Sequence, residues 1–277
     1  MAIIQADFFS KLLKRIVPFN MILPIDSVIP SPKPQALPLK TLYLLHGYMG
    51  GVMDLFGRFS LGEFAEQNNL AIVMPDGENH FYTDDTQRND LYGEFIGREL
   101  IEFTRLMFPL SDKREDTIIG GISMGGYGAL INGLKYNDVF SRIIAISPAI
   151  ITHELKNATE EPDYIGCTSG FYESVFGDLT TAAERDTDPF FLSEKLAREK
   201  AIFPNIYFAC GCNDRLVHTN RKLDSHLTAL NIPHIYEENE GTHDNLFFTP
   251  HLIKALSGIP LTRNPIPPNP FWIENPK

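Results

Sequence analysis

The sequence predicts an α/β fold, with a mostly parallel central sheet, antiparallel strands at its N-terminal end and helices on both faces. Three observations support this prediction. Short apolar runs alternate along the chain with segments of helical periodicity, which is typical of parallel strands joined by helices. One such unit is sharply defined, because the strand-like run 116–120 is followed closely by the helix-like segment 126–136. Near the N-terminus, residues 8–26 alternate short apolar and polar stretches, which predicts antiparallel edge strands.

Length and composition favour one large domain. The chain has 277 residues, of which 43% are hydrophobic, and this is enough for a single well-buried core. We therefore expect residues 1–277 to form a single domain. The formal net charge of -11 disfavours binding to nucleic acid or to an anionic membrane, because like charges repel.

Cysteine usage and the N-terminal sequence indicate the compartment. The three cysteines, Cys167, Cys210 and Cys212, cannot complete a disulfide framework, and no His and carboxylate cluster has the spacing of metal ligands. Residues 1–9 lack the basic segment and long apolar run of a secretory signal, and no segment approaches the roughly 20 apolar residues that span a bilayer. We expect reduced thiols, no metal and a cytoplasmic location.

The first half of the chain predicts two buried strands whose ends carry polar loops. The proline-rich segment 30–38 predicts an extended surface connection, and 41–45 predicts a buried strand that runs into the loop 46–51. A helix is expected at 59–68, a strand at 70–74 and a helix at about 92–108. Ligands in open α/β sheets bind outside the carboxyl ends of the strands, so the loop 78–90 should face the site. Tyr82 in that loop is our candidate for a substrate contact.

The second half predicts three more strands and one irregular region. Strands are expected at 142–146, 205–211 and 234–238, with a helix at about 220–230. Residues 151–200 interrupt the alternation with glycines and aromatic residues, which predicts either a lid or specificity insertion or two packed helices with a structural role. The tail from residue 259 carries six prolines and is expected to be extended and partly packed.

The segment Gly121-Ile122-Ser123-Met124-Gly125 has the G-x-S-x-G pattern of a nucleophile elbow, in the strand, turn and helix context that this motif requires. A tight turn from strand to helix brings backbone close to backbone, so a Cβ at Gly121 or Gly125 would clash. Ser123 should then project at the N-terminus of the helix, where an oxyanion is stabilised. The amides of Met124 and of Tyr48, in the His-Gly loop, are the two candidate oxyanion donors. His46 is assigned to structure.

A serine nucleophile needs an imidazole to take its proton and a carboxylate to orient that imidazole. Asp214 and His243 follow predicted strand ends on the elbow side, and Ser123, Asp214, His243 is the chain order of the α/β-hydrolase fold. These three residues are the predicted catalytic triad. Asp186 and Asp188 are the reserve candidates for the acid.

The motifs around Leu44-Leu45-His46-Gly47, Ser123-Met124-Gly125-Gly126-Tyr127-Gly128 and Gly241-Thr242-His243 together resemble the esterase D family, and within it the bacterial tributyrin-type carboxylesterases. The resemblance extends from about residue 8 to 256. It implies an α/β-hydrolase without a cofactor that acts on small-molecule esters of short acyl groups, with the same triad and oxyanion residues. Asn245 and Phe248 stand where this family often has tryptophan, so the pockets for acyl and alcohol groups are expected to differ.

Three functions are compatible with the predicted fold. The leading interpretation is a serine carboxylesterase that forms an acyl-enzyme on Ser123. The alternative is an acyltransferase or a thioester hydrolase similar to S-formylglutathione hydrolases, because the choice of water, alcohol or thiol depends on pocket shape. A non-catalytic binding protein on the same fold is disfavoured, since all the catalytic positions are filled. The sequence allows a homo-oligomer.

Overall fold

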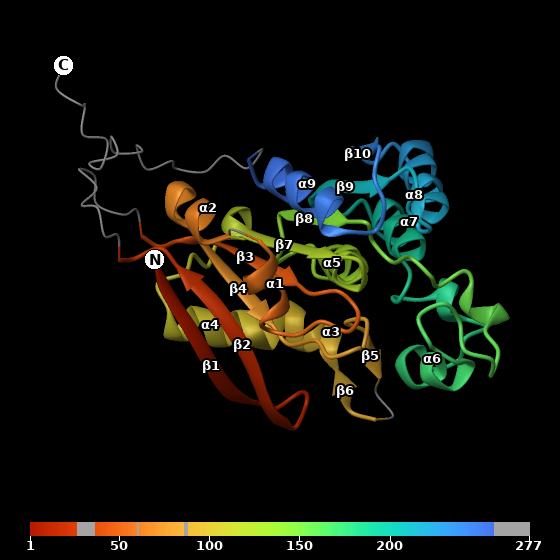
Figure 1. Cartoon of the computed structure of the whole chain (residues 1–277), viewed down its shortest axis with the longest axis horizontal. Helices are drawn as coiled ribbons and strands as arrows, with labels where there is room; N and C mark the ends of the chain where they lie inside the picture. The colour runs from red at the N-terminus through yellow and green to blue at the C-terminus, as the bar shows by residue number, and fades with distance from the viewer. Residues whose placement is uncertain (27–36, 60, 86–87, 258–277) are drawn as a thin grey trace, which may run out of the picture.

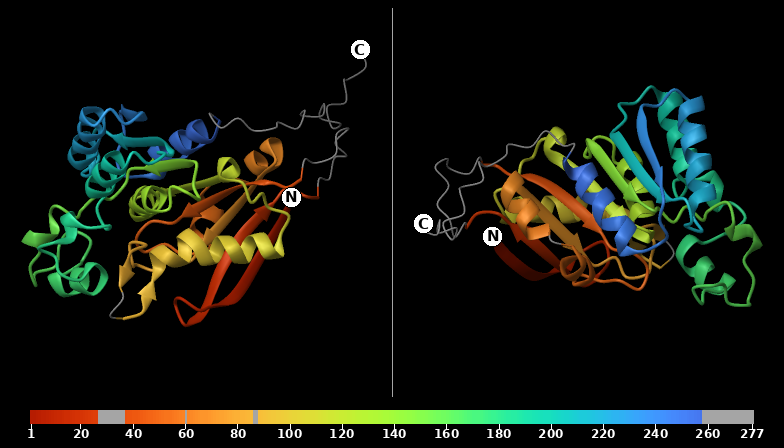
Figure 2. Two further views of the ribbon diagram at one scale, coloured as in Figure 1. Left: turned by 180° about the vertical axis from the view of Figure 1, so that it is seen from behind. Right: turned by 45° about the horizontal axis from the view of Figure 1, so that its top comes forward.

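The computed structural model describes residues 1–26, 37–59, 61–85 and 88–257. Most of the predicted proline-rich connection and the predicted proline-rich tail lie outside these residues. Figure 1 shows the arrangement of the elements, and Figure 2 shows it from two further sides.

Eight strands form one sheet within the described residues, in the order β1-β2-β4-β3-β7-β8-β9-β10. Strand β2 pairs antiparallel with β1 on one side and with β4 on the other. From β4 onward, each neighbouring pair in this order is parallel. The strands span Ala2–Ser10 (β1), Arg15–Leu23 (β2), Lys40–Leu45 (β3), Leu70–Pro75 (β4), Thr117–Ile122 (β7), Arg142–Ile146 (β8), Asn205–Gly211 (β9) and His234–Asn239 (β10). The predicted mostly parallel sheet with antiparallel N-terminal strands is confirmed.

Helices cover both faces of this sheet (Figure 2), because the buried strands place apolar side chains on each face in turn. In β3, Tyr43 and Leu45 belong to one core cluster, whereas Leu42 and Leu44 belong to the other. The first cluster includes side chains from α4, α5, α7 and α8, which span Leu100–Met107, Met124–Lys135, Pro189–Glu199 and Val217–Ala229. The second includes side chains from α1, α2 and α9, which span Asp54–Arg58, Leu61–Asn68 and Asn245–Ser257.

Two predicted helices differ from the structure in their details. The helix expected at 59–68 is α2, and the structure adds a short helix before it, α1. The helix expected at about 92–108 is continuous in space but begins with one turn, α3 (Tyr92–Glu94), and a π-helical stretch, Phe95–Glu99, before α4. The loop before it carries a small two-stranded sheet, β5 (Asp84–Asp85) and β6 (Asp90–Leu91).

The region 151–200 contains two helices, α6 (Ser169–Phe176) and α7, with short 3₁₀ turns at Leu155–Asn157 and Ala182–Glu184. α7 packs against α5 and α8, so its part of the region belongs to the helical layer. The segment that contains α6 projects at one end of the molecule in Figure 1, beyond the carboxyl ends of the strands that carry the candidate triad. The region therefore divides into a packed helix and a projecting part.

Candidate active site

Ser123 lies on a sharp turn between β7 and α5 with φ 57° and ψ −117°, a backbone conformation that is strained for a residue with a side chain. A Cβ at Gly121 would lie 2.2 Å from the carbonyl oxygen of Gly125, and one at Gly125 would lie 2.1 Å from that of Leu45. The Ser123 amide donates to the carbonyl of Ile146 at 2.9 Å. The turn therefore depends on both glycines and is held by the neighbouring strand β8.

Ser123, His243 and Asp214 are joined by two hydrogen bonds. His243 Nδ1 donates to Asp214 Oδ2 at 2.7 Å, and the hydroxyl of Ser123 donates to His243 Nε2 at 2.9 Å. Because the bond to Asp214 fixes the proton on Nδ1, Nε2 is left as an acceptor toward the serine. The residues come from the loops after β7, β9 and β10, at the carboxyl ends of three parallel strands.

Asp214 is held as a carboxylate. It is buried, and burial works to raise its pKa, but hydrogen bonds from His243 and from the amide of Leu216, together with the charge of His243, outweigh burial. The net effect is a pKa of Asp214 below its ordinary value. The carboxylate therefore keeps its charge, and with it the orientation of the imidazole, well into the acid range.

Backbone contacts hold the loops of the acid and the base together. The amide of Asn213 donates to the carbonyl of Gly241 at 3.0 Å, and that of Cys212 donates to the carbonyl of Asn239 at 2.9 Å. A Cβ at Gly211 would lie 2.4 Å from the Gly241 oxygen, so the two loops are in close contact. The distance between Asp214 and His243 is thus set by the packing of β9 against β10.

The loop after β3 passes next to the nucleophile. A Cβ at Gly47 would lie 3.4 Å from both the Ser123 Cβ and the Ile122 carbonyl oxygen. Tyr48 follows Gly47, and its amide makes no hydrogen bond that is observed within the described part of the chain. Met124 is the first residue of α5, where an amide has no partner inside the helix. The two candidate donors flank Ser123.

His46 lies behind this loop and outside the triad. Its ring is fully buried, with Nδ1 donating to the Gly47 carbonyl at 2.9 Å and Nε2 accepting from the Gly77 amide at 3.0 Å. Both ring nitrogens are used for backbone contacts. The imidazole therefore fixes the shape of the loop that carries Tyr48.

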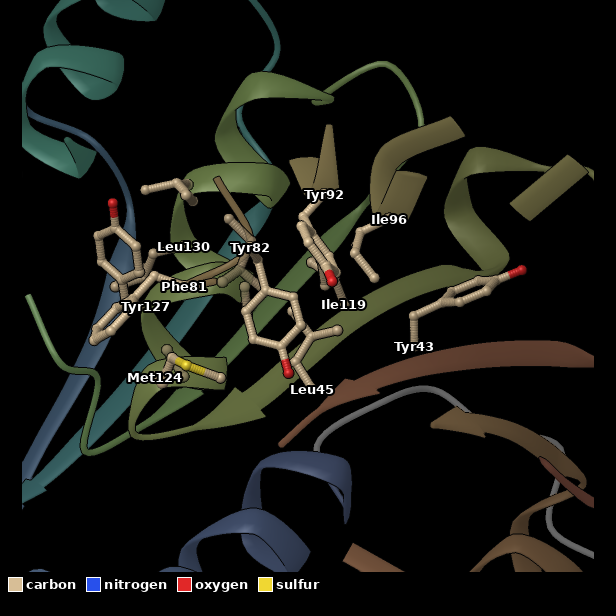
Figure 3. Packing of buried hydrophobic residues seen from close by; sticks show 14 of the residues in the cluster. Tyr43, Leu45, Phe81, Tyr82, Tyr92, Ile96, Ile119, Met124, Tyr127 and Leu130 are labelled. Atoms are coloured by element: carbon tan, nitrogen blue, oxygen red, sulfur yellow. The ribbon is translucent and has the colours of Figure 1, made fainter. Parts of the chain in front are cut away.

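Tyr82 is not brought to the nucleophile. Its side chain is fully buried, and its hydroxyl donates to the carbonyl of His46 at 3.0 Å. Figure 3 shows Tyr82 among the buried side chains of the core, with Phe81 and Tyr127 in the same cluster. It also lines a separate cavity of about 260 Å³ that no triad residue lines. Its position favours support of the oxyanion loop over contact with substrate.

The reserve acids Asp186 and Asp188 have other partners. Asp188 caps the N-terminus of α7 by accepting from the Phe191 amide, and it also accepts from the Thr152 hydroxyl. Asp186 pairs with Lys195 at 3.3 Å. Among the described residues, the carboxylate that bonds to His243 Nδ1 is Asp214.

Two small cavities meet at Ser123. One, of about 160 Å³, is lined by Ser123 and His243 together with Asp54, Asn245 and Phe248. The other, of about 30 Å³, is lined by Ser123 and Met124 but not by His243. A third cavity of about 520 Å³ lies beyond the second. The second and third share five lining residues: Ile151, Tyr164, Tyr172, Arg215 and Leu216.

Four residues that line the cavity of about 30 Å³ were not among the site residues predicted from the sequence. Tyr164, Ile165 and Tyr172 come from the projecting part of region 151–200, and Arg215 directly follows Asp214. The available signal was the cluster of aromatic residues in a region without regular alternation. That signal pointed to the region and not to individual side chains.

The described residues lack both a metal-binding cluster and a membrane-spanning helix. No group of three or more His, Cys, Asp or Glu side chains there is arranged to hold a metal ion. In the same residues, no helix combines the length and the hydropathy that a membrane span requires.

The chain matches known esterases in sequence. A family model described as "Putative esterase" matches residues 10–259. The chain is 45% identical over 260 residues to an acetyl esterase from Caldicellulosiruptor saccharolyticus, and these residues make up 92% of this chain and 97% of that protein.

Two solved structures from Staphylococcus aureus are similar along most of the chain. They are the fluorophosphonate-binding serine hydrolase FphF, with a TM-score of 0.80, and the S-formylglutathione hydrolase FrmB, with a TM-score of 0.79. Each is 26% identical to this chain and covers 92% of it and 97% of the other chain. The chain belongs to this esterase family, an esterase D-like group of serine hydrolases with the α/β-hydrolase fold.

Proposed function

We propose that this enzyme hydrolyses carboxylic esters of short acyl groups through an acyl-enzyme on Ser123. The observation that carries the proposal is the hydrogen-bonded series from Asp214 through His243 to Ser123, at the point where two small cavities meet. The substrate is a small-molecule ester, as for an esterase of this family.

The proposed reaction has two steps of the same kind. Ser123 Oγ attacks the ester carbonyl while His243 Nε2 takes its proton, and the resulting imidazolium gives that proton to the departing alcohol oxygen. Water then attacks the acyl-enzyme, with His243 as the base, and release of the acid restores Ser123. Asp214 keeps the imidazole in the required tautomer and stabilises its charged form.

The amides of Tyr48 and Met124 are the proposed oxyanion hole. Backbone N–H groups aimed at the developing negative charge lower the barrier because they need no reorganisation during the reaction. Met124 also stands at the N-terminus of α5, whose dipole favours negative charge. The closeness of the Gly47 backbone to Ser123 supports the role of Tyr48.

The two cavities at Ser123 are assigned to the two halves of the ester. The leaving alcohol must receive a proton from His243, so we place it in the cavity of about 160 Å³ that His243 lines. The acyl group then enters the cavity of about 30 Å³ beside Met124. That volume has room for about two water-sized groups, which fits an acetyl group. The relative at 45% identity is named an acetyl esterase, which supports the same preference.

A thioester substrate is the second candidate. The similarity to an S-formylglutathione hydrolase over 92% of the chain favours it, and the same triad would expel a thiol in place of an alcohol. A formyl group is smaller than acetyl and would also fit the cavity beside Met124.

The test is release of p-nitrophenol from acetyl, butyryl and octanoyl esters by the wild type, Ser123→Ala and His243→Ala. We expect turnover that falls with acyl length and drops at least about 10³-fold in both variants. A full-strength rate in Ser123→Ala would refute the acyl-enzyme. A burst followed by slow turnover would instead indicate an acyltransferase, and faster hydrolysis of S-formylglutathione than of any ester would establish the second candidate.

Three broader features of the proposal concern the whole chain. A single domain is supported by the one sheet that extends from β1 to β10. A cytoplasmic location is supported by the free state of Cys167, Cys210 and Cys212. Sedimentation velocity would test for a homo-oligomer, because it gives the mass of the particle in solution.

A further inference from the structure

Tyr164 and Arg215 stack on each other where the acyl cavity meets the larger cavity. The guanidinium carbon of Arg215 lies 3.9 Å from the centroid of the Tyr164 ring. Both residues line the cavity of about 30 Å³ at Ser123, and both line the cavity of about 520 Å³ beyond it. The stacked pair is therefore part of the wall between the two spaces.

One side of this wall is fixed by a braced turn in the insertion. Asp163, directly before Tyr164, accepts hydrogen bonds from the amides of Ile165 at 2.9 Å and Cys167 at 3.0 Å, and from the hydroxyl of Tyr172 at 2.5 Å. Burial works to raise the pKa of Asp163, but these hydrogen bonds outweigh it, so the carboxylate is held in its charged, accepting form. Tyr164 thus projects from a turn whose backbone is fixed.

The same turn is attached to the oxyanion loop. The thiol of Cys167 donates to the hydroxyl of Tyr48 at 3.1 Å, and the Tyr48 ring also contacts the Phe171 ring, with centroids 5.9 Å apart. Burial raises the pKa of the Cys167 thiol, which keeps it protonated as a donor. The turn and the Tyr48 loop therefore hold a fixed relation to each other, and the wall stands at a set place beside Ser123.

Arg215 lies on the other side of the wall. It follows Asp214, whose carboxylate also accepts from the amide of Leu216, so the start of this loop is held by the catalytic acid. Arg215 forms no ion pair with a described residue, and its observed partner is the Tyr164 ring. The two residues thus hold each other, one from the insertion and one from the triad loop.

We propose that the Tyr164–Arg215 stack sets the maximum acyl length of the enzyme, by separating the cavity at Ser123 from the cavity of about 520 Å³. The inference rests on the proposed function. With the wall in place, acyl groups much longer than acetyl have no room in the small cavity. Without it, an uncharged longer chain would extend past Ile151 and Leu216 into the larger space.

The experiment compares kcat/KM for p-nitrophenyl octanoate with that for the acetate in the wild type and in Tyr164→Ala, Arg215→Ala and Tyr164→Phe. The ratio of octanoate to acetate should rise at least about tenfold in both alanine variants, since apolar contacts of a methylene or more are worth that much in a matching pocket. Tyr164→Phe keeps the ring and should keep the wild-type ratio. Arg98→Ala is the control, because Arg98 lies outside the site and also stacks on a tyrosine, Tyr136, at 5.2 Å, in addition to its ion pair with Asp138.

Titration of each protein with a fluorophosphonate counts the competent serines, so a loss of folded enzyme does not enter the ratio. A ratio unchanged in both alanine variants, with a wild type that hydrolyses the acetate, would overturn the wall and leave the proposed function intact. A wild type without acetate turnover would overturn the proposed function and the inference with it. If the alanine variants instead changed the relative kcat/KM for acetate esters of different alcohols, the assignment of this cavity to the acyl group would be overturned.

Discussion

The carboxylate of Asp214 determines which nitrogen of His243 faces the serine. Replacing it by an amide in Asp214→Asn keeps the shape but allows the ring to present Nε2–H to Ser123, which cannot take a proton. We expect kcat to fall by about 10⁴-fold, with a much smaller change in KM. Steady-state kinetics on p-nitrophenyl acetate would measure both. A loss below tenfold would mean that another group orients the imidazole.

The lowered pKa of Asp214 also predicts how stability depends on pH. The native state favours the carboxylate more than the unfolded state does, so the stabilisation is complete above the ordinary pKa of about 4 and is lost as pH falls through the lowered native value. The difference in unfolding free energy between the wild type and Asp214→Asn should be constant at neutral pH and shrink in acid. Urea titrations at a series of pH values would show this. A difference that grows on acidification would contradict the sign.

Single residues also show which parts of the site could be predicted from the sequence. Ser123, Asp214 and His243 follow strand ends, and strands were readable from their apolar runs, so their convergence could be predicted. Tyr82 follows a strand end too, but a positive φ of 57° turns it into the core, where its hydroxyl meets the His46 carbonyl. A backbone reversal at a non-glycine residue leaves no mark in the sequence.

At the scale of elements, the turn from β7 to α5 depends on space that only glycine leaves. In Gly125→Ala the new Cβ would overlap the Leu45 carbonyl on β3, a backbone atom that cannot move without shifting the sheet. We expect the unfolding free energy to drop by about 3 kcal/mol, at the upper end for overpacking, and activity to be lost with the position of Ser123. Denaturant unfolding and an esterase assay would measure the two effects.

Gly51→Ala is the matched control for that substitution. Gly51 lies in the loop after β3, and a Cβ there would meet nothing within 4 Å. Its effect on stability should stay within about 0.5 kcal/mol. Equal losses in the two variants would mean that the contact with Leu45 does not explain the requirement for glycine, because the loss of unfolded-chain entropy in a Gly→Ala substitution is itself stabilising.

The elements themselves were predicted to different degrees. The parallel strands were found nearly to the residue, since continuous apolar runs bounded by polar residues mark them. The π-helical stretch Phe95–Glu99 was not, because it preserves the helical direction and only adds a residue to one turn. The projecting part of 151–200 was left open between two interpretations, because its position relative to Ser123 depends on contacts such as that of Cys167 with Tyr48.

For the molecule as a whole, the net charge of -11 predicts how substrate charge and salt affect the rate. A negative protein attracts a cationic ester and repels an anionic one, and salt screens both effects. Between low salt and about 0.5 M salt, where the screening length falls to a few ångströms, kcat/KM should fall for acetylcholine and rise for 4-acetoxybenzoate. Phenyl acetate, which is neutral, is the control. The same trend for all three esters would exclude electrostatic steering.

The strand order of the whole sheet joins regions that are distant in sequence, and it explains why the site could be predicted at all. Parallel pairing places the carboxyl ends of β7, β9 and β10 on one edge, so any prediction of the strands predicts which loops meet. The antiparallel hairpin β1–β2 adds to the far end of the sheet and contributes no triad residue. What pairing does not determine is which side chains fill the space above that edge, and these set the substrate.

The last strand, β10, has a consequence for how the enzyme fails. Within the described residues it pairs with β9 alone, its side chains are half-buried or exposed, and the loop that follows it carries His243. Ser123, in contrast, follows the interior strand β7. Edges of sheets open by local fluctuation at a lower free energy than the whole domain. Amide hydrogen exchange should therefore be faster in β10 than in β7, and activity should disappear at a denaturant concentration where the rest of the protein is still folded.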